Sequence, residues 1–415
     1  MIHPMASPAE IAARAEGRRE FMLALLRRLV DWNSFSRNPA GIAGVLDILG
    51  AALSEVGLEV EMVREGGAPA HLLARSKAGK SPSPSSSSSP SPSPILLVGH
   101  ADTVFPPEDD RKMATVDGRV HGPGTCDMKG GLVVLVEALR EVAPALRLGR
   151  GAVEVVINGD EELGSPRSRD LVVERARRAP ACLVFEPTDE LDAVVLRRKG
   201  LGQAKVLVLG RAAHAGVCPE AGANALAEMA RKVLAVQALG DPAREVTVTA
   251  TVARAGTSRN TVPDRAELEV DLRYRTRPDG EALVARLREI AGACAVPGTR
   301  GSVDAWLHRP PMNPDHAAGR LLAVAAAAAR DLGLPPLRGV DSGGGSDANL
   351  AADAGCPSLD GLGVVGRNAH TVDEYALVDS LPQRTALAAL LLERLFALTE
   401  PLAGGPAVAA FEAPP

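Results

Sequence analysis

The sequence predicts an α/β protein in which a smaller α+β unit interrupts a larger domain built around a mostly parallel sheet. Three observations carry this prediction. Apolar strand patterns alternate with helix patterns over residues 95–187, which is typical of a parallel sheet flanked by helices. From residue 200 the strands alternate between apolar and polar residues, as in a sheet with one solvated face. After residue 310 the long helix patterns return, so the smaller unit is inserted into the larger domain.

The larger domain is expected to begin with two amphipathic helices, over residues 8–31 and 42–56, and a strand near 58–63. The next expected elements are a strand in "ILLVGHAD" (95–102), a glycine turn and helix in "DMKGGLVVLVEALREV" (127–142), and strands in "GAVEVVING" (151–159) and "ACLVFEP" (181–187). In such sheets, functional groups gather just beyond the carboxyl ends of the strands. A functional site is therefore expected at those strand ends.

The pattern of the smaller unit predicts strand, helix, strand, strand, helix, strand, which is the order of a ferredoxin-like α+β unit. The predicted domains are residues 1–198 and 310–400 for the larger part, 199–309 for the insert, and 401–415 for a flexible tail. Residues 81–94, "SPSPSSSSSPSPSP", contain nothing apolar, and proline prevents helix and ladder pairing. This tract is expected to be a disordered surface loop, either a tolerated insertion or a segment that binds a partner.

Composition excludes several classes of function. Aromatic residues make up only 2% and the net charge is -5, so neither base stacking nor a basic nucleic-acid or lipid surface is expected. The five cysteines are scattered and form no CxxC pair, which argues against a disulfide framework or a thiolate zinc site. No signal peptide and no apolar run long enough to cross a bilayer is recognised. A reducing, cytoplasmic location is expected, with no membrane or nucleic-acid partner.

Histidines and carboxylates recur where predicted core strands end, and each has a purely structural alternative. His100 and Asp102 lie two residues apart, so they point to the same side of a strand. Such a carboxylate can hold the second nitrogen of a metal-binding histidine, or the pair can be structural. Asp127 precedes a glycine pair that opens a helix, where it could simply be an N-cap. Residues 160–162, Asp-Glu-Glu, could be an exposed acidic turn.

Two further residues complete this set: Glu186 directly follows an apolar strand, and His370 lies in a polar loop. A carboxylate at the end of a buried strand usually has a partner. Histidine and carboxylate without cysteine suit Zn²⁺, Mn²⁺ or Co²⁺ in an open catalytic site rather than a closed structural one. Two histidines and three acids are enough for two metal ions that share one carboxylate.

The sequence resembles the di-zinc aminoacylase/carboxypeptidase family of metallopeptidases over about residues 20–398. In chain order, the resemblance rests on "GHADTVFP", "GPGTCDMKGG", "NGDEELGS", "FEPT", "RAAHAG" and "GGGSDAN". Glutamate at position 186, "AHAGVCPEAGANAL" and "SGGGSDAN" are most similar to the glutamate carboxypeptidase branch, which includes folate-cleaving enzymes of the G type. The resemblance implies a zinc-peptidase-like catalytic domain with an inserted lid and dimerisation domain.

The resemblance also implies a role for each candidate residue of the larger domain. His100 and Glu186 would complete one zinc site, Glu162 and His370 would complete the other, and Asp127 would bridge the two ions. Glu161 would be the general base, and Asp102 would orient His100. The family also has a cis peptide bond after the bridging aspartate, here Asp127-Met128.

Three residues of the insert have counterparts in the family's substrate site. His214 resembles a lid histidine that reaches the active site of the partner subunit, and its alternative is a strand-end histidine without a role. Asn260 resembles a substrate contact. Arg273 lies on the polar face of the expected strand "RAELEVDLRYR". It would clamp the α-carboxylate of the substrate with its guanidinium fork, or form only a salt bridge on a solvated face.

The expected reaction is hydrolysis of an amide bond in an N-acyl amino acid or peptide, with C-terminal glutamate as the expected product. Two Zn²⁺ per subunit are expected, replaceable by Co²⁺ or Mn²⁺, in a homodimer formed through the insert. An N-acetyl or N-succinyl amino-acid deacylase is the close alternative, and a metal-free binding protein is a more distant one. Nucleotide binding is disfavoured because "GPGTCDMKGG" lacks the G-x-x-x-x-G-K-[ST] order. The sequence assigns no role to Cys126 and Cys218.

Overall fold

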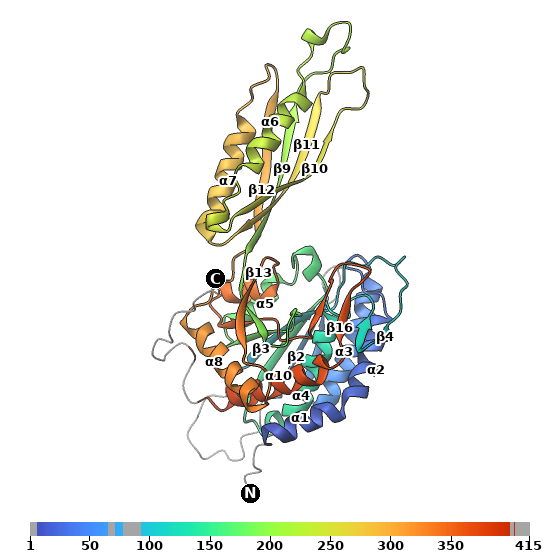
Figure 1. Cartoon of the computed structure of the whole chain (residues 1–415), viewed down its shortest axis with the longest axis vertical. Coiled ribbons are helices and arrows are strands. Elements are labelled where there is room, and N and C mark those ends of the chain that lie inside the picture. The colour runs from blue at the N-terminus through green and yellow to red at the C-terminus, as the bar shows by residue number, and fades with distance from the viewer. Residues whose placement is uncertain (1–5, 65–70, 78–92, 399–401, 403–415) are drawn as a thin grey trace. The chain divides into compact units, whose positions relative to one another are not determined.

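The computed structural model describes residues 6–64, 71–77, 93–398 and 402 (Figure 1). The chain divides into two compact units. Unit 1 comprises residues 1–197, 314–341 and 346–415, and unit 2 comprises residues 198–313 and 342–345. Of the serine-proline tract, all but residues 93–94 lies outside the described residues. Of the predicted tail, only Leu402 is described, and it is buried with its carbonyl accepting from Arg320 Nη1 at 3.2 Å.

A mixed six-stranded sheet forms the centre of unit 1. Its strands are, in spatial order, β1 (Glu59–Val63), β2 (His71–Arg75), β6 (Val153–Asn158), β3 (Ile95–His100), β7 (Cys182–Val184) and β14 (Ser358–Leu359). The four strands from β6 to β14 are parallel, as the strand–helix alternation predicts. Strands β1 and β2 add an antiparallel edge. The carboxyl ends of β6, β3 and β7 therefore meet at one edge of the sheet.

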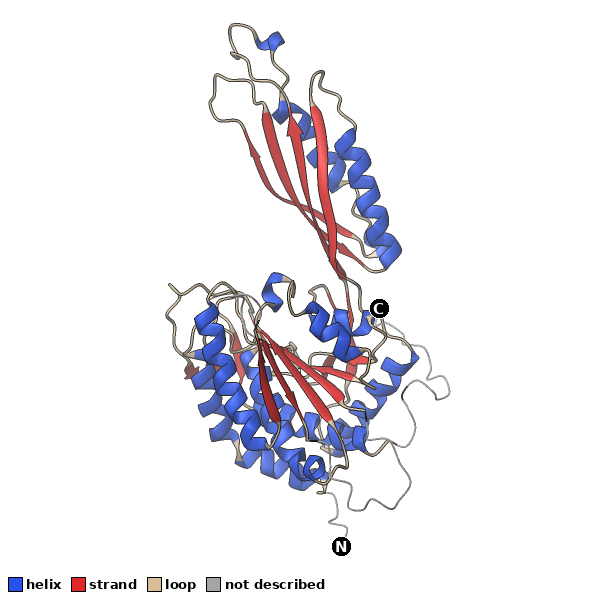
Figure 2. Ribbon diagram, turned by 180° about the vertical axis from the view of Figure 1, so that it is seen from behind, coloured by secondary structure: helices blue, strands red, loops and turns tan. Residues whose placement is uncertain are grey.

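Helices cover both faces of this sheet (Figure 2). They are α1 (Pro8–Gly17), α2 (Arg19–Val30), α3 (Pro39–Val56), α4 (Lys129–Arg147), α5 (Arg169–Ala176), α8 (His316–Asp331), α9 (Asp347–Asp353) and α10 (Ser380–Phe396). The main core cluster joins α4 and α10 to Ile95 and Leu97 of β3. Leu96 and Val98 alternate to the opposite side and are equally buried. Both faces of β3 are thus covered, which explains its continuous apolar sequence.

The single helix expected over residues 8–31 is in fact two helices. Arg18 has φ -103° and ψ 6°, outside the helical region, and separates α1 from α2. Ser7 caps α1 with a capping box completed by Glu10, and α1 ends at Gly17. The amphipathic pattern predicted the helical face correctly but not the break within it.

A small four-stranded sheet connects two distant stretches of unit 1. Its order is β15 (Gly366–Arg367), β16 (Tyr375–Leu377), β5 (Arg119–His121) and β4 (Ala114–Val116), and Tyr375 pairs with His121. The loop between β15 and β16 carries His370, and the segment after β5 leads to Asp127. Pairing of β16 with β5 therefore brings together residues that are far apart in the sequence. A further pair, β8 (Ala193–Arg198) with β13 (Arg338–Ser342), lies outside this sheet.

Unit 2 has the order expected of a ferredoxin-like unit: β9 (Gly200–Leu209), α6 (Ala225–Gln237), β10 (Thr247–Ala255), β11 (Arg265–Tyr274), α7 (Arg277–Gly292) and β12 (Arg300–Arg309). The sheet order is β10-β11-β9-β12, and every pairing is antiparallel. Alternate residues of β11 are buried in a separate core with α6 and α7. Three short 3-10 helices complete the described elements of the chain: η1 (Glu161–Leu163), η2 (Pro219–Ala221) and η3 (Pro242–Arg244).

Among the described residues, one helix is long and apolar enough to cross a membrane by length and composition alone. This helix is α3, whose 18 residues have a mean hydropathy of 1.4. Such a run was not expected from the sequence. Half of α3 is buried in the structure, and its buried residues, among them Ile42, Leu46 and Leu49, belong to the core of unit 1. Its apolar composition is therefore explained by packing within the fold.

Candidate metal centre

Five of the predicted site residues lie close together. Four lie near the edge of the central sheet where the carboxyl ends of its parallel strands meet, and the fifth lies in a loop of the small sheet. His100 is the last residue of β3, and Asp127 lies two residues before α4. Glu162 is in η1, just after β6, and Glu186 follows β7 by two residues. His370 is in the loop between β15 and β16. Parallel strands thus explain why residues from separate parts of the sequence converge.

The carboxylate of Asp127 lies between the two histidines. His100 Nε2 is 3.1 Å from Asp127 Oδ1, and His370 Nε2 is 3.2 Å from Asp127 Oδ2. Glu186 Oε1 is 3.6 Å from His100 Nε2, and Glu162 Oε2 is 3.2 Å from His370 Nε2. The five side chains therefore form two groups of three that share one carboxylate.

Asp102 supports both groups without belonging to either. Its backbone carbonyl lies 3.0 Å from His100 Nδ1, and its carboxylate Oδ1 is 3.4 Å from the same nitrogen. The two carboxylate oxygens also accept the main-chain N–H groups of Glu161 and Glu162, each at 3.2 Å. Ser36 donates its hydroxyl to Oδ2 at 2.8 Å. Asp102 is fully buried, so one carboxylate fixes the His100 ring and the start of the acidic turn.

The first residue of the acidic triplet, Asp160, bonds the segment that follows the turn. Its carboxylate accepts the main-chain N–H groups of Arg167 and Ser168 at 2.8 and 3.3 Å, and the Ser168 hydroxyl at 2.5 Å. Asp160 is 1% exposed, so these bonds satisfy a carboxylate that water does not reach. The three neighbouring acids thus have different surroundings, and the alternative of one exposed acidic turn is wrong for Asp160.

The donor set and its charge fit a divalent metal ion. His100, Asp127 and Glu162 each offer an atom within 4.8 Å of the other two. Glu162 Oε1 is buried and has no hydrogen-bond partner among the described residues, which leaves an orphaned acceptor in the cluster. Hydrogen bonds with Asp127 and Glu162 raise the pKa of His370 to about 11, so the cluster attracts positive charge. Imidazole and carboxylate ligands without thiolate suit Zn²⁺, Co²⁺ or Mn²⁺.

The pKa values of Glu186 and Asp127 are shifted in opposite directions. Burial and the neighbouring Asp127 raise the pKa of Glu186 well above its usual value. Hydrogen bonds from the two histidines outweigh burial at Asp127 and lower its pKa. Like charges packed this closely need a cation to offset their repulsion. A metal ion next to Glu186 would supply that charge.

The backbone around the cluster adopts two uncommon conformations. The Asp127-Met128 peptide bond is cis, as the resemblance implied. His370 has φ 65°, in the left-handed region that side-chain-bearing residues seldom enter. A residue held in that region costs about 1–3 kcal/mol, and such residues cluster at functional sites. At His370 this conformation directs the loop so that Nε2 meets both Asp127 and Glu162.

The candidates in unit 2 fall at opposite ends of its sheet. His214 follows β9 and forms an isolated bridge with Thr261, while Ala215 N donates to Asn260 O at 2.9 Å. Arg273 lies near the far end of the ten-residue strand β11. Its Nε and Nη2 donate to Asp271 at 2.8 and 3.0 Å, and Nη1 donates to the Gly343 carbonyl at 3.3 Å. The structure thus brings His214 and Asn260 together and separates Arg273 from them.

His214 has a defined hydrogen-bonding pattern. Gly216 N and Val217 N lie 3.2 and 3.1 Å from His214 Nδ1, so this nitrogen is the acceptor and the proton of the neutral ring is on Nε2. The side chain is exposed. An exposed Nε2–H is a donor available for another molecule.

Sequence reasoning missed two buried charged residues close to Asp127, one in contact with its main chain and one two residues after it in the chain. Glu374 accepts main-chain N–H bonds from Gly124, Cys126 and Asp127, and burial raises its pKa to about 7. Lys129 is 1% exposed and donates from Nζ to the Trp32 carbonyl at 3.0 Å. The signal available for Glu374 was its position four residues after His370 in "HTVDEY".

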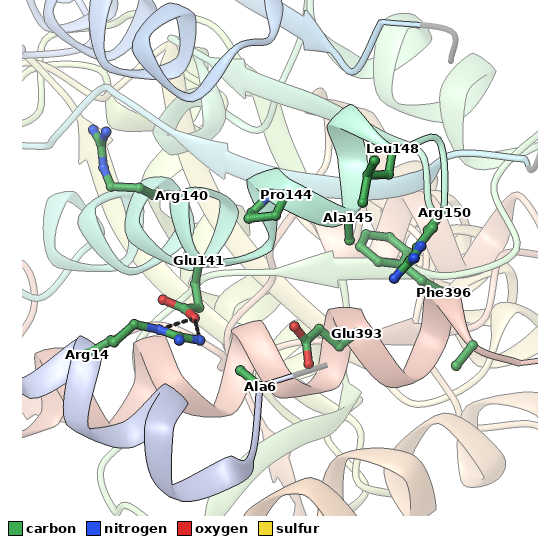
Figure 3. A pocket seen from close by; sticks show the side chains of 11 residues that line it. Ala6, Arg14, Arg140, Glu141, Pro144, Ala145, Leu148, Arg150, Glu393 and Phe396 are labelled. Atoms are coloured by element: carbon green, nitrogen blue, oxygen red, sulfur yellow. Dashed lines mark hydrogen bonds and ion pairs between the residues drawn. The ribbon is translucent and has the colours of Figure 1, made fainter. Parts of the chain in front are cut away.

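A large cavity lies elsewhere in unit 1. It has a volume of about 790 Å³ and is lined by residues of α1, α4 and α10 and their adjoining loops (Figure 3). Ala145, on its wall, is sixteen residues along α4 from Lys129, which corresponds to roughly 24 Å of helix. The cavity is therefore separate from the histidine and carboxylate cluster.

Comparison with known proteins finds relatives over most of the chain. Residues 96–394 match the model of the Peptidase family M20/M25/M40. Carboxypeptidase G2 of Pseudomonas sp. (strain RS-16) is 32% identical over 377 residues, which cover 89% of this chain and 88% of that protein. A succinyl-diaminopimelate desuccinylase of Gluconacetobacter diazotrophicus is 28% identical and covers 90% of this chain and 96% of its own. The solved structure of aminopeptidase PepT from Bacillus cereus superposes with a TM-score of 0.74 at 26% identity, over 91% of this chain and 98% of its own.

Proposed function

The chain belongs to the Peptidase family M20/M25/M40, whose members hydrolyse peptide or amide bonds. We propose that it is a zinc-dependent carboxypeptidase that releases C-terminal glutamate from N-acyl amino acids or peptides. The observation that carries this proposal is the Asp127 carboxylate, which lies 3.1 and 3.2 Å from the two histidines. A shared carboxylate between two histidine–carboxylate groups suits two adjacent metal ions.

We assign His100 and Glu186 to one ion, His370 and Glu162 to the other, and Asp127 to both. The two ions are proposed to be Zn²⁺, with Co²⁺ or Mn²⁺ as substitutes. When bound, they would supply an activated water and polarise the scissile carbonyl. Asp102 would keep His100 in one orientation through Nδ1, as its carbonyl and carboxylate distances of 3.0 and 3.4 Å indicate.

Glu161 is proposed as the general base and general acid. Its main chain is fixed by the bond from its N–H to Asp102 Oδ1. The Glu161 carboxylate would accept a proton from the attacking water and then donate it to the amine nitrogen as the carbon–nitrogen bond breaks. One residue therefore returns to its starting protonation state at the end of each turnover.

Residues of unit 2 are proposed to bind the substrate. His214 would donate its Nε2–H to the negative charge that develops on the carbonyl oxygen, which its acceptor role at Nδ1 supports. The Arg273 guanidinium would bind the free carboxylate of the leaving amino acid together with Asn260 of the partner subunit, because Asn260 lies beside His214 at the opposite end of the sheet from Arg273. We further propose a cytoplasmic homodimer that forms through unit 2, with His214 acting on the active site of the partner subunit.

The choice of glutamate rests on the 32% identity with carboxypeptidase G2 and on glutamate at position 186. The second candidate is an N-acyl amino-acid deacylase, which the 28% identity with a succinyl-diaminopimelate desuccinylase favours. Rates of amine release from N-acyl-glutamate, N-succinyl-diaminopimelate, N-acetylornithine and dipeptides, measured side by side with zinc or cobalt added, separate these candidates. Preference for N-acyl-glutamate supports the carboxypeptidase. Preference for N-succinyl-diaminopimelate or N-acetylornithine overturns it.

A pair of variants tests the catalytic assignment. Glu161→Gln should lower kcat by about 10²–10⁴-fold, because it removes the proton carrier, while both zinc ions remain bound. Glu162→Gln, the neighbouring carboxylate, should instead lose zinc. Elemental analysis and kcat are measured on the same samples. Full activity in Glu161→Gln, or unchanged zinc content in Glu162→Gln, would contradict the roles assigned to these two carboxylates.

A further inference from the structure

Glu374 is a fully buried carboxylate that accepts hydrogen bonds from the main chain of one short loop. Its Oε1 accepts the N–H groups of Cys126 and Asp127 at 2.8 and 3.0 Å, and its Oε2 accepts the N–H of Gly124 at 3.1 Å. The side chain is 0% exposed. Three main-chain donors directed at one carboxylate form a small anion-binding cradle.

Glu374 belongs to the same loop as His370, so its hydrogen bonds connect that loop to the segment that ends at Asp127. It lies four residues after His370, in the loop that ends where β16 begins at Tyr375. The cradle that it occupies ends at Asp127, whose carboxylate lies between His370 and His100. Glu374 therefore joins the loop of one histidine to the backbone of the carboxylate that both histidines approach.

The strand pairing alone does not fix the position of Asp127 relative to the loop that carries His370. Strand β16 pairs with β5, but Gly122 and Gly124 lie between β5 and Asp127, with φ values of 145° and 78°. Glycines in such conformations give the loop many alternative paths. The three bonds to Glu374 select one of these paths at the residue where the metal-binding geometry is most sensitive.

We propose that Glu374 is a positioning residue that sets the distance between His370 and Asp127, and thereby the affinity for the ion that these residues share. This inference rests on the metal centre of the proposed function. Glu374 is not assigned as a ligand, because its carboxylate faces three main-chain donors and the two histidines contact other carboxylates. Outer carboxylates of this kind typically change metal affinity by about 10–100-fold when they are removed.

The test compares Glu374→Gln with a matched control in the full chain. Glutamine can accept through only one oxygen and would turn its NH₂ group toward N–H donors. Glu228 is the control: it is 2% exposed and accepts the N–H groups of Ala295 and Val296 at 2.9 and 2.8 Å, but it lies in unit 2. Glu228→Gln should lose stability and keep the wild-type affinity for metal.

Zinc affinity is measured by chelator competition, and the metal geometry by the visible spectrum of the Co²⁺ form. In Glu374→Gln, the ion assigned to His370 and Glu162 should bind about 10–100-fold more weakly, with an altered spectrum, and the ion assigned to His100 and Glu186 should lose less affinity. Two ions bound as in the wild type would overturn the inference. A wild-type protein that binds no metal would instead overturn the proposed function, so the two failures are distinct.

Glu374→Asp provides a second variant in case glutamine prevents folding. Aspartate keeps the charge but is one methylene shorter, so it cannot reach all three donors from the same backbone position. The expected result is a folded protein, checked by circular dichroism, with a smaller loss of affinity for the same ion. Wild-type affinity and spectrum in a folded Glu374→Asp would also contradict the positioning role.

Discussion

The main-chain N–H of Glu161 donates to the carboxylate of Asp102 at 3.2 Å. Asp102 lies two residues beyond the end of β3, and Glu161 begins η1 after the neighbouring parallel strand β6. The bond therefore ties the ends of two adjacent strands together. The same Asp102 faces the Nδ1 atom of His100, so the orientation of a proposed metal ligand and the position of the proposed base depend on one buried side chain.

Asp102→Asn should lower zinc affinity and kcat/KM together, by about 10–100-fold. Asparagine has one acceptor oxygen, so it cannot accept from Glu161 and Glu162 while it also faces His100. Ser36→Ala is the control, because it removes the 2.8 Å bond to Asp102 Oδ2 and a 3.2 Å bond to the Thr103 carbonyl but leaves the Asp102 carboxylate in place, and it should cost about 1 kcal/mol of stability. Zinc content and steady-state kinetics are measured for both. If both substitutions change zinc content and kcat/KM equally, the contacts of Asp102 with His100, Glu161 and Glu162 are not needed for zinc binding.

Gly131→Ala should destabilise unit 1 by about 1–3 kcal/mol and weaken zinc binding. A Cβ atom at Gly131 would lie 1.9 Å from the Phe185 carbonyl oxygen, so α4 would have to move away from the strand end that carries Glu186. Gly319, in α8, is the control because a Cβ there meets nothing within 4 Å. Gly319→Ala should stabilise by about 0.5–1 kcal/mol. Urea unfolding measures the free energy of unfolding of both variants. A Gly131→Ala protein as stable as the wild type would contradict the close approach of Gly131 to the Phe185 carbonyl oxygen.

Glu393→Gln should stabilise the protein at neutral pH. Burial and the nearby Glu141 raise the pKa of Glu393, and its Oε2 is buried without a hydrogen-bond partner among the described residues, in the cavity of Figure 3. A carboxyl whose pKa is raised on folding holds its proton more tightly in the folded state. Stability is therefore lost as the pH rises from about 4.5, the ordinary value, through the raised pKa.

Thermal unfolding at several pH values checks this sign. Glu393→Gln should have a Tm higher than that of the wild type by about 1–3 °C at pH 8, and the difference should shrink toward pH 4. Glu20→Gln, which replaces an exposed carboxylate on α2, should give no comparable change with pH. If the difference in Tm between Glu393→Gln and the wild type grows as the pH falls, the pKa of Glu393 is not raised on folding.

The candidate metal ligands could be found from sequence because their positions follow from strand ends. His100, Glu162 and Glu186 each lie at or just beyond an apolar strand, and parallel strands place such ends at one edge of the sheet. His370 was found as a histidine in a polar loop, and the structure places that loop in the small sheet and not at an end of the central one. The break at Arg18 and the antiparallel edge β1–β2 were not predicted, because local apolar periodicity does not record where a helix divides or how an edge strand pairs.

The sequence by itself determined the two-unit α/β architecture, the order of elements in the insert, and which residue types stand where strands end. Only the tertiary structure decided how these residues meet: that Asp127 lies between His100 and His370, that Asp102 holds the turn of Glu161, and that Glu374 holds the loop of Asp127. The physical reason is the range of the interactions. Periodicity and turn chemistry act over a few neighbouring residues, whereas these hydrogen bonds join segments that only the pairing of β3 with β6 and of β16 with β5 brings together.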